Sequence, residues 1–326
     1  MGEDDSATEE TAKVIFVRKP LDEQSGSLFP DPGEWSFSKR QVLFQCLRKY
    51  YYLYYGANSR TARAEPLKDK LRELKGLSNV HLRSGDILDL VIRSYLTHSS
   101  PDDRWDSDRL ERWALAIFRK DQAFNRAGMP SSEGDQYPPV PFLEYRHRFT
   151  DAEERYAAAE AKLVTAIRNF SRAPVYEFYR EYGARAGAMI QHRTQLQIDG
   201  APARGKLDLA FEGPEFFEIV DWKIGVEGGA DERLQVGFYG VWAACRPEIR
   251  KPIRLSMAYL GDCKVKHFNL EDLRPRSVRA RITQDLNVMR TLEPFGVAAN
   301  ARAFTPCAQP KICALCPFQR ICPQKE

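Results

Sequence analysis

The stretch FFEIVDWKIG, residues 216–225, places two charged residues inside an apolar run. Its apolar residues predict a buried strand, but Asp221 and Lys223 interrupt that pattern near its end. Burying a charge without a partner is costly. We therefore expect these two side chains either to form a salt bridge or to lie in a functional site, and the neighbouring segments bear on the choice.

The preceding segment GKLDLAF, residues 205–211, is joined to this strand by a four-residue loop that contains Gly-Pro. Such a loop between two apolar runs predicts an antiparallel hairpin. If Phe211 pairs with Phe216, then Asp208 and Asp221 become diagonal neighbours on one face of the sheet. A slip of one residue would remove this arrangement, because it sends every side chain to the other face.

Two carboxylates at that separation repel each other unless a cation lies between them. Mg²⁺ and Mn²⁺ prefer oxygen ligands, which Asp208, Asp221 and the backbone carbonyl of Trp222 can supply. Lys223 would then lie close to a metal-bound water, whose pKa the metal lowers. The pattern predicts a divalent metal site in which Lys223 orients that water or stabilises charge on a phosphate. A plain salt bridge at the end of a strand is the alternative.

A predicted helix, residues 230–245, follows the lysine strand directly. Gln235 and Tyr239 lie four residues apart and therefore on one face of it. Their neutral hydrogen-bonding groups suit contacts with a phosphate or a base. Taken alone, the pair could equally consist of ordinary surface or core-edge residues.

The order Gly-x-x-Asp, Asp-x-Lys, Gln-x-x-x-Tyr resembles the PD-(D/E)XK nuclease superfamily, and within it the RecB-like nuclease family. The resemblance implies an α/β fold, with a restriction-endonuclease-like mixed β-sheet core flanked by helices. It also implies that the acids bind the metal and that the lysine serves the attacking water. The helix that carries Gln-x-x-x-Tyr is implied to contact DNA. The matching residues are Gly205, Asp208, Asp221, Lys223, Gln235 and Tyr239.

This sequence departs from the family pattern in the upstream helix, where members usually carry Gly-x-x-x-His. Here Gly85 is followed by Asp89 in place of the histidine. An aspartate can bind a hard cation, so we expect Asp89 to be a third ligand. His81 or His98 could serve instead, or metal binding and activity could be weak.

Cys313, Cys316 and Cys322 form a C-x₂-C-x₅-C run near the C-terminus. Nearby Cys307 would complete a local zinc site. Cys46, far away in the sequence, is the other candidate for a fourth ligand. One distant cysteine followed by this run resembles the iron–sulfur branch of the family, which includes CRISPR spacer-acquisition nucleases and AddB nuclease domains. The resemblance implies a 4Fe–4S cluster held by Cys46 and the C-terminal run; zinc is the alternative.

Basic residues elsewhere are candidates for DNA contacts. The segment CLRKYYYLYYG, residues 46–56, combines basic residues with aromatic ones, a composition that suits single-stranded nucleic acid. Tyrosines at helical spacing, however, usually pack against neighbouring side chains. Arg60 and Arg63 just beyond it are better candidates for phosphate contacts. Lys39, Arg40 and Lys206 could add to the same basic surface, and an ordinary solvated charge is the alternative for each of these residues.

The chain of 326 residues carries a net charge of +4, which permits nucleic-acid binding without requiring it. It shows no signal peptide and no apolar segment long enough to span a membrane, so we expect a cytoplasmic protein. We divide it into an N-terminal tail with a possible strand (1–35), a helical cap (36–186), a nuclease core (187–291) and a cysteine module (292–326). Helices are predicted at 36–56, 66–76, 85–97, 105–123, 150–170, 230–245 and 271–291, and strands at 12–20, 188–199, 204–212, 215–224, 252–260 and 263–270.

The sequence thus predicts a metal-dependent DNA nuclease, acting as an exonuclease on single-stranded DNA or DNA ends. The alternative is an inactive or weak DNA-end-binding scaffold within a larger DNA-processing complex of several proteins. A third possibility is a zinc-containing RNA-binding protein without hydrolytic activity.

Overall fold

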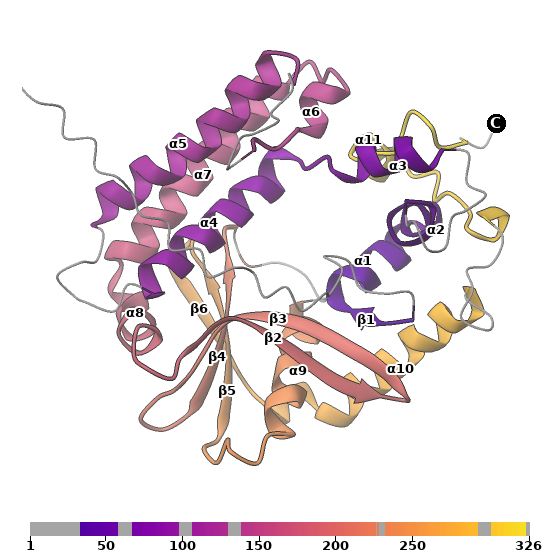
Figure 1. Cartoon of the computed structure of the whole chain (residues 1–326). Helices are drawn as coiled ribbons and strands as arrows, with labels where there is room; N and C mark the ends of the chain where they lie inside the picture. Colours follow the sequence, from indigo (N-terminus) through magenta and orange to yellow (C-terminus); the bar gives the residue numbers. More distant parts are fainter. Residues whose placement is uncertain are drawn as a thin grey trace, which may run out of the picture.

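The computed structural model describes residues 33–57, 67–97, 106–129, 138–225, 227, 232–292 and 301–323 (Figure 1). The predicted strand at 12–20 lies outside these residues, as do Arg60, Arg63 and His98. Within the described part, a mixed β-sheet has helices on both faces. The predicted α/β architecture is therefore confirmed.

The sheet has the strand order β1-β3-β4-β5-β6, and β2 pairs with β3 beside this path. Pairing is antiparallel between β2 and β3, β3 and β4, and β5 and β6, and parallel between β4 and β5. A parallel pair needs a long crossover, which helix α9 provides. The strands are β1 (Trp35–Ser36), β2 (Met189–Ile198), β3 (Ala201–Glu212), β4 (Phe217–Lys223), β5 (Ile253–Tyr259) and β6 (Lys264–Asn269).

The helices occupy the predicted segments, with additions between them. A short helix, α6, ends the segment 124–146 that lacks a clear sequence period, and two more follow near 180 and 312. The helices are α1 (Phe37–Gln45), α2 (Leu47–Tyr51), α3 (Lys68–Lys75), α4 (Val80–Thr97), α5 (Ser107–Arg126), α6 (Leu143–Arg146), α7 (Ala152–Arg172), α8 (Glu177–Gly183), α9 (Glu232–Ala244), α10 (Pro275–Leu292) and α11 (Pro310–Ala314). No described helix is both long and apolar enough to cross a membrane.

The two faces of the sheet are covered by different parts of the chain. Helices α4, α5, α7 and α8 pack on one face, where Leu209, Val220 and Trp222 point. Helices α9 and α10 pack on the other face, together with the N-terminal helices and the C-terminal segment (Figure 1). The end of β4 therefore lies between α4 on one side and α9 on the other.

The single helix predicted over residues 36–56 is divided at Cys46. Ser36 caps the first part, because its Oγ accepts a hydrogen bond from the backbone N–H of Lys39 at 3.2 Å. Cys46 has an extended backbone with φ −165° and ψ 114°, and the chain resumes as α2 and the π-helical turn η1 (Tyr52–Gly56).

The tyrosines of this region belong to the core. Tyr50 is fully buried and packs with its neighbours around Phe304, and Tyr52 lies 5.1 Å from Phe318 between ring centroids. Both phenylalanines come from the C-terminal segment. The aromatic run therefore joins the two ends of the described chain, and the suggestion that these rings bind nucleic acid is wrong for the buried members.

The β3–β4 hairpin has a different register from the predicted one. Phe211 pairs with Glu218 rather than with Phe216, which is a shift of two residues. The turn closes through the N–H of Gly213, which donates to the carbonyl of Phe216 at 2.9 Å. Continued by one residue, this register sets Asp208 opposite Asp221 instead of diagonal to it.

Candidate active site

Four charged side chains meet where β3 and β4 approach α4, and we call them the acid centre: Asp89, Asp208, Asp221 and Lys223. Burial raises the pKa of Asp208 well above its usual range, and the charges of Asp221 and Asp89 raise it further. Burial also raises the pKa of Asp89 to about 6; Lys206 lowers it, and Asp221 adds to the rise. The three carboxyl groups thus lie close enough to repel one another.

Asp221 and Lys223 contact each other and the helix behind them. Asp221 is only 3% exposed, and its Oδ2 lies 2.6 Å from Nζ of Lys223. Gln235 on α9 joins both residues, because its Nε2 donates to Asp221 Oδ1 at 2.9 Å and its Oε1 accepts from Lys223 Nζ at 3.0 Å. These contacts join the Asp-x-Lys strand to the Gln-x-x-x-Tyr helix.

Asp208 has separate partners. Its Oδ2 accepts a hydrogen bond from the backbone N–H of Trp222 at 2.9 Å, and its Oδ1 accepts from Nε2 of Gln191 at 3.2 Å. Sequence reasoning missed Gln191, since nothing in its own segment marks it. Gln191 lies between Ile190 and His192 on β2, whose partners on β3 flank Asp208.

The charge of Lys223 is maintained by its neighbours. Burial alone would lower the pKa of this ammonium group, but the Asp221 carboxylate, with Asp208 and Glu232, leaves the pKa above its usual value. Lys223 therefore carries a positive charge at neutral pH. It can donate a hydrogen bond to an anion but cannot accept a proton from water.

The glycine of the Gly-x-x-Asp motif has a packing role. A Cβ on Gly205 would lie 2.6 Å from Cε1 of Phe238 and 2.9 Å from Cε1 of Tyr239, both on α9. The hydroxyl of Tyr239 donates to the backbone carbonyl of Lys206 at 2.8 Å, and Tyr239 is 4% exposed. Tyr239 thus fixes β3 against α9, and its burial does not fit the predicted direct contact with DNA.

The sequence predicts Asp89, or else His81 or His98, as a third metal ligand. The structure places Asp89 at the acid centre. His81 lies on the same helix, but burial lowers its pKa and the charges that act on it come from Lys162 and Arg155 of α7. No acid of the acid centre contributes to that shift. Of the two described alternatives, Asp89 is the residue near Asp208 and Asp221.

The donor set of the acid centre suits a divalent cation, although the geometry is not that of a preformed metal site. Within the described ranges, no three or more histidine, cysteine or acidic side chains are arranged to hold a metal ion. Both oxygens of Asp208 and Oδ1 of Asp221 accept hydrogen bonds, whereas Asp221 Oδ2 is buried and, among the described residues, has only the ion pair with Lys223. The mutual repulsion of the two carboxylates is nevertheless the kind that a hard cation relieves. Trp222 donates its N–H to Asp208 and packs its ring on Phe170, and its carbonyl as a ligand stays a prediction.

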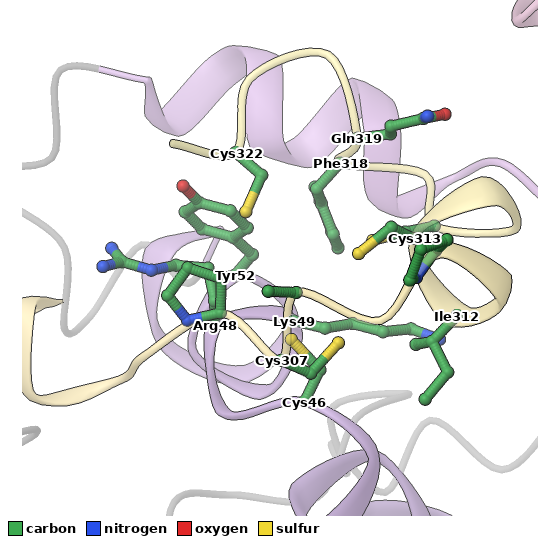
Figure 2. Close-up of a pocket in the computed structure, with 14 residues that line it drawn as sticks. Cys46, Arg48, Lys49, Tyr52, Cys307, Ile312, Cys313, Phe318, Gln319 and Cys322 are labelled. Carbon is green, nitrogen blue, oxygen red and sulfur yellow. The ribbon is translucent and has the colours of Figure 1, made fainter. Parts of the chain in front are cut away.

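The second feature is a cavity of about 340 Å³ between α2 and the C-terminal segment, which we call the cysteine cavity. It is lined by Cys46, Cys307, Cys313, Cys316 and Cys322, and Figure 2 shows the four labelled cysteines pointing into it. Burial raises the pKa of Cys316 to about 11, and Cys46 and Cys322 are among the groups that raise it further. The fold thus brings Cys46 to the C-terminal run, as predicted, and adds Cys307.

The basic residues predicted to contact DNA have different surroundings. Lys206 is exposed and close enough to Asp89 to affect its pKa. Lys39 is completely buried, with Nζ 5.5 Å from the ring centroid of Tyr50, and Arg40 forms a 2.9 Å ion pair with buried Asp285. Lys39 and Arg40 therefore belong to the interior, and their proposed place on a basic surface is wrong.

Comparison with known proteins gives a family match and distant structural likenesses. A family model described as the PD-(D/E)XK nuclease superfamily matches residues 34–323. No curated protein matches the chain. A provisionally assigned exonuclease from Eubacterium rectale is similar at 14% identity and a TM-score of 0.40, covering 80% of this chain and 82% of the other. The protein SSO0001 is similar at 11% identity and a TM-score of 0.29, covering 74% and 96%. Likenesses this distant carry no argument about function.

Proposed function

Because this chain belongs to the PD-(D/E)XK nuclease superfamily, we propose that it is a metal-dependent deoxyribonuclease. Its substrates are single-stranded DNA or DNA ends, and it acts as an exonuclease of the RecB-like family. The observation that supports this best is the joining of Asp221, Lys223 and Gln235 in one hydrogen-bonded group beside Asp208 and Asp89. Residues 187–291 form the catalytic core in this proposal, and residues 36–186 cover it.

Asp208, Asp221 and Asp89 would hold Mg²⁺ or Mn²⁺, with the carbonyl of Trp222 as a further ligand. The metal supplies acidification of a water molecule and stabilisation of charge on the phosphate. Gln235 and Lys223 each contact one oxygen of Asp221, and every carboxylate oxygen has a second lone pair that would be available to a cation. Lys223 has three N–H donors, so it could also donate to a phosphate oxygen.

Lys223 acts in this proposal as a charged hydrogen-bond donor. Its raised pKa leaves it protonated at neutral pH, so it stabilises negative charge and orients water rather than removing a proton. Gln235 holds the ammonium group by accepting from Nζ, and Tyr239 keeps β3 against α9. These contacts fix the lysine relative to the acids.

The test is cleavage of end-labelled single- and double-stranded DNA with Mn²⁺, Mg²⁺ or EDTA. Asp221→Asn is compared with Asp262→Asn, which removes an acid in the β5–β6 turn. We expect metal-dependent cutting by the wild type and by Asp262→Asn, and none by Asp221→Asn. Shortening from one labelled end would identify the exonuclease and its polarity.

A DNA-end-binding scaffold of a larger DNA-processing complex remains the second candidate. It is favoured by Asp89 in place of the family histidine and by the protein donors that occupy the acid oxygens. A wild type that binds DNA but cuts it with neither metal would support the scaffold and contradict the nuclease.

We also propose that Cys46, Cys313, Cys316 and Cys322 hold a 4Fe–4S cluster that joins the two ends of the chain. A single zinc ion needs four ligands about 2.0–2.3 Å from one point. The cysteines line one cavity of about 340 Å³, which has room for a group larger than one ion and so supports the cluster. Iron and acid-labile sulfide in anaerobically purified protein would support the cluster, and stoichiometric zinc without sulfide would support the alternative.

A further inference from the structure

The outward face of the β2–β3 hairpin carries two cations opposite each other. Arg193 on β2 is the register partner of Lys206 on β3, and both side chains are exposed. Directly opposed residues share a face of the sheet, and like charges in that position destabilise the pair. Such an arrangement indicates a face that receives negative charge from outside the protein.

Neighbouring cations on the same side of the molecule differ from this pair. Arg204, two residues before Lys206, forms a 2.7 Å ion pair with Glu34, and Arg83 on α4 forms a 2.7 Å ion pair with Asp121. Among the described residues, no acid forms an ion pair with Arg193 or Lys206. The charge of Arg193 is thus available to a ligand, and that of Lys206 acts only on the nearby carboxyl groups of Asp86 and Asp89 without forming an ion pair.

Both cations lie close to the acid centre. Lys206 lowers the pKa of Asp89 and of Asp86, so its ammonium group lies on the α4 side of the sheet. It precedes Asp208 by two residues, or about 6.6 Å along the strand. The backbone of Lys206 is fixed, because its carbonyl accepts the hydrogen bond from Tyr239.

The face of this pair continues away from the acid centre as a polar row. Arg193, Gln195 and Gln197 are alternate, exposed residues of β2. Gln191, at the other end of the strand, has a left-handed backbone with φ 51° and donates to Asp208. Long amide side chains and arginine are the groups that contact phosphate and sugar in nucleic-acid complexes. Figure 1 shows this hairpin extending from below α4 to below β1 and α1.

The geometry points to Arg193 and Lys206 as a phosphate-binding pair that holds the DNA strand beside the phosphate to be cut. This inference rests on the proposed nuclease function and adds the path of the strand, along β2 and away from Asp208. Arg193 lies outside the Gly-x-x-Asp, Asp-x-Lys and Gln-x-x-x-Tyr motifs. Its role is to bind and position the strand, and it touches no reacting atom.

The first experiment measures binding of a fluorescein-labelled single-stranded oligonucleotide by anisotropy, in EDTA, over a series of KCl concentrations. Arg193→Gln and Lys206→Gln are each compared with Lys264→Gln, which removes an exposed charge on the opposite edge strand β6. Each pair variant should reduce the slope of log K against log[KCl] by about 0.7, the value for one phosphate of a single strand. Lys264→Gln should keep the wild-type slope.

The second experiment places one neutral methylphosphonate at successive positions around the cut site. One position should weaken binding by the wild type and have a smaller effect on Arg193→Gln, because only Lys206 still contacts the phosphate in that variant. Equal losses for wild type and variant at every position, or wild-type salt slopes for both pair variants, would overturn the pair while leaving the nuclease intact. A wild type that binds no DNA would overturn both.

Discussion

The acid centre and the cysteine cavity draw their residues from different distances along the chain. Asp208, Asp221, Lys223 and Gln235 come from consecutive strands and the next helix, and only Asp89 is distant. The cysteine cavity instead joins Cys46 to residues 307–322. A site made of adjacent strands is held by the sheet itself, whereas a site made of two chain ends depends on whatever joins them. We therefore expect substitutions in the first to affect activity and substitutions in the second to affect stability.

The largest effect should come from Asp208→Asn. Loss of a metal ligand should reduce cleavage by more than about a hundredfold, since even residues behind the ligands contribute 10- to 100-fold. Thermal stability without metal should not fall, because the change removes a carboxylate that its neighbours repel. Cleavage rates and melting curves of the same preparation test this. A melting temperature lowered as far as that of a cysteine variant would break the proposed contrast.

Cys46→Ala should lower thermal stability first and cleavage only as a result. Its loss separates α2 from the C-terminal segment, so we expect a melting temperature lower by several degrees and loss of bound iron, with reduced activity as a consequence. Cys245→Ala is the control, because Cys245 is exposed and lies outside the cavity. Full retention of iron and stability by Cys46→Ala would show that Cys307 can replace it.

Gly205→Ala should affect both properties, because this residue connects the acid centre to the packing of α9. The new methyl group would lie 2.6 Å from Cε1 of Phe238 and 2.9 Å from Cε1 of Tyr239, so these rings must shift, and Gln235 lies on the same helix. We expect a loss of about 1–3 kcal/mol in the free energy of unfolding and about a tenfold to hundredfold loss of cleavage. Gly85→Ala on α4 is the matched control, since a Cβ there meets nothing within 4 Å.

The smallest effect concerns pH. Asp89 has a pKa of about 6 in the folded protein, above the 3.8 of an exposed aspartate. Between these values the folded protein retains a proton that the unfolded chain has lost, so the free energy of unfolding falls as pH rises through this window. Asp89→Asn should therefore raise the melting temperature of metal-free protein more at pH 7 than at pH 4.5.

The same carboxyl group should make metal binding pH-dependent. Mn²⁺ affinity should fall as pH decreases below about 6, because the cation must displace the proton of Asp89. Asp89→Asn should bind Mn²⁺ more weakly and lose part of this dependence. Titrations at pH 5 and pH 7.5 measure both effects. An unchanged affinity in the variant would remove Asp89 from the ligand set.

The hairpin motifs were predicted from sequence because their residues lie close together along the chain. Alternation along β3 and β4 and the helix that follows them brought Asp208, Asp221, Lys223 and Gln235 to one place. The predicted register was wrong by two residues, since hydrogen bonding of Gly213 to Phe216 sets the turn. An even shift returns each side chain to its original face, so the two acids still meet.

The sequence by itself determined the order of helices and strands, the acid and lysine motifs and the cysteine spacing, because each depends on local periodicity or on residues close together in the chain. Only the tertiary structure decided that Gln191 holds Asp208, that Lys39 is buried and that Cys307 lines the cavity with Cys46. Cys46 and Cys307 lie far apart in the sequence, and that separation carries no information about their distance in space. Gln191 and Arg193 meet Asp208 and Lys206 across the β2–β3 hairpin, where the register of the two strands decides the pairing and no residue of β2 by itself reveals it.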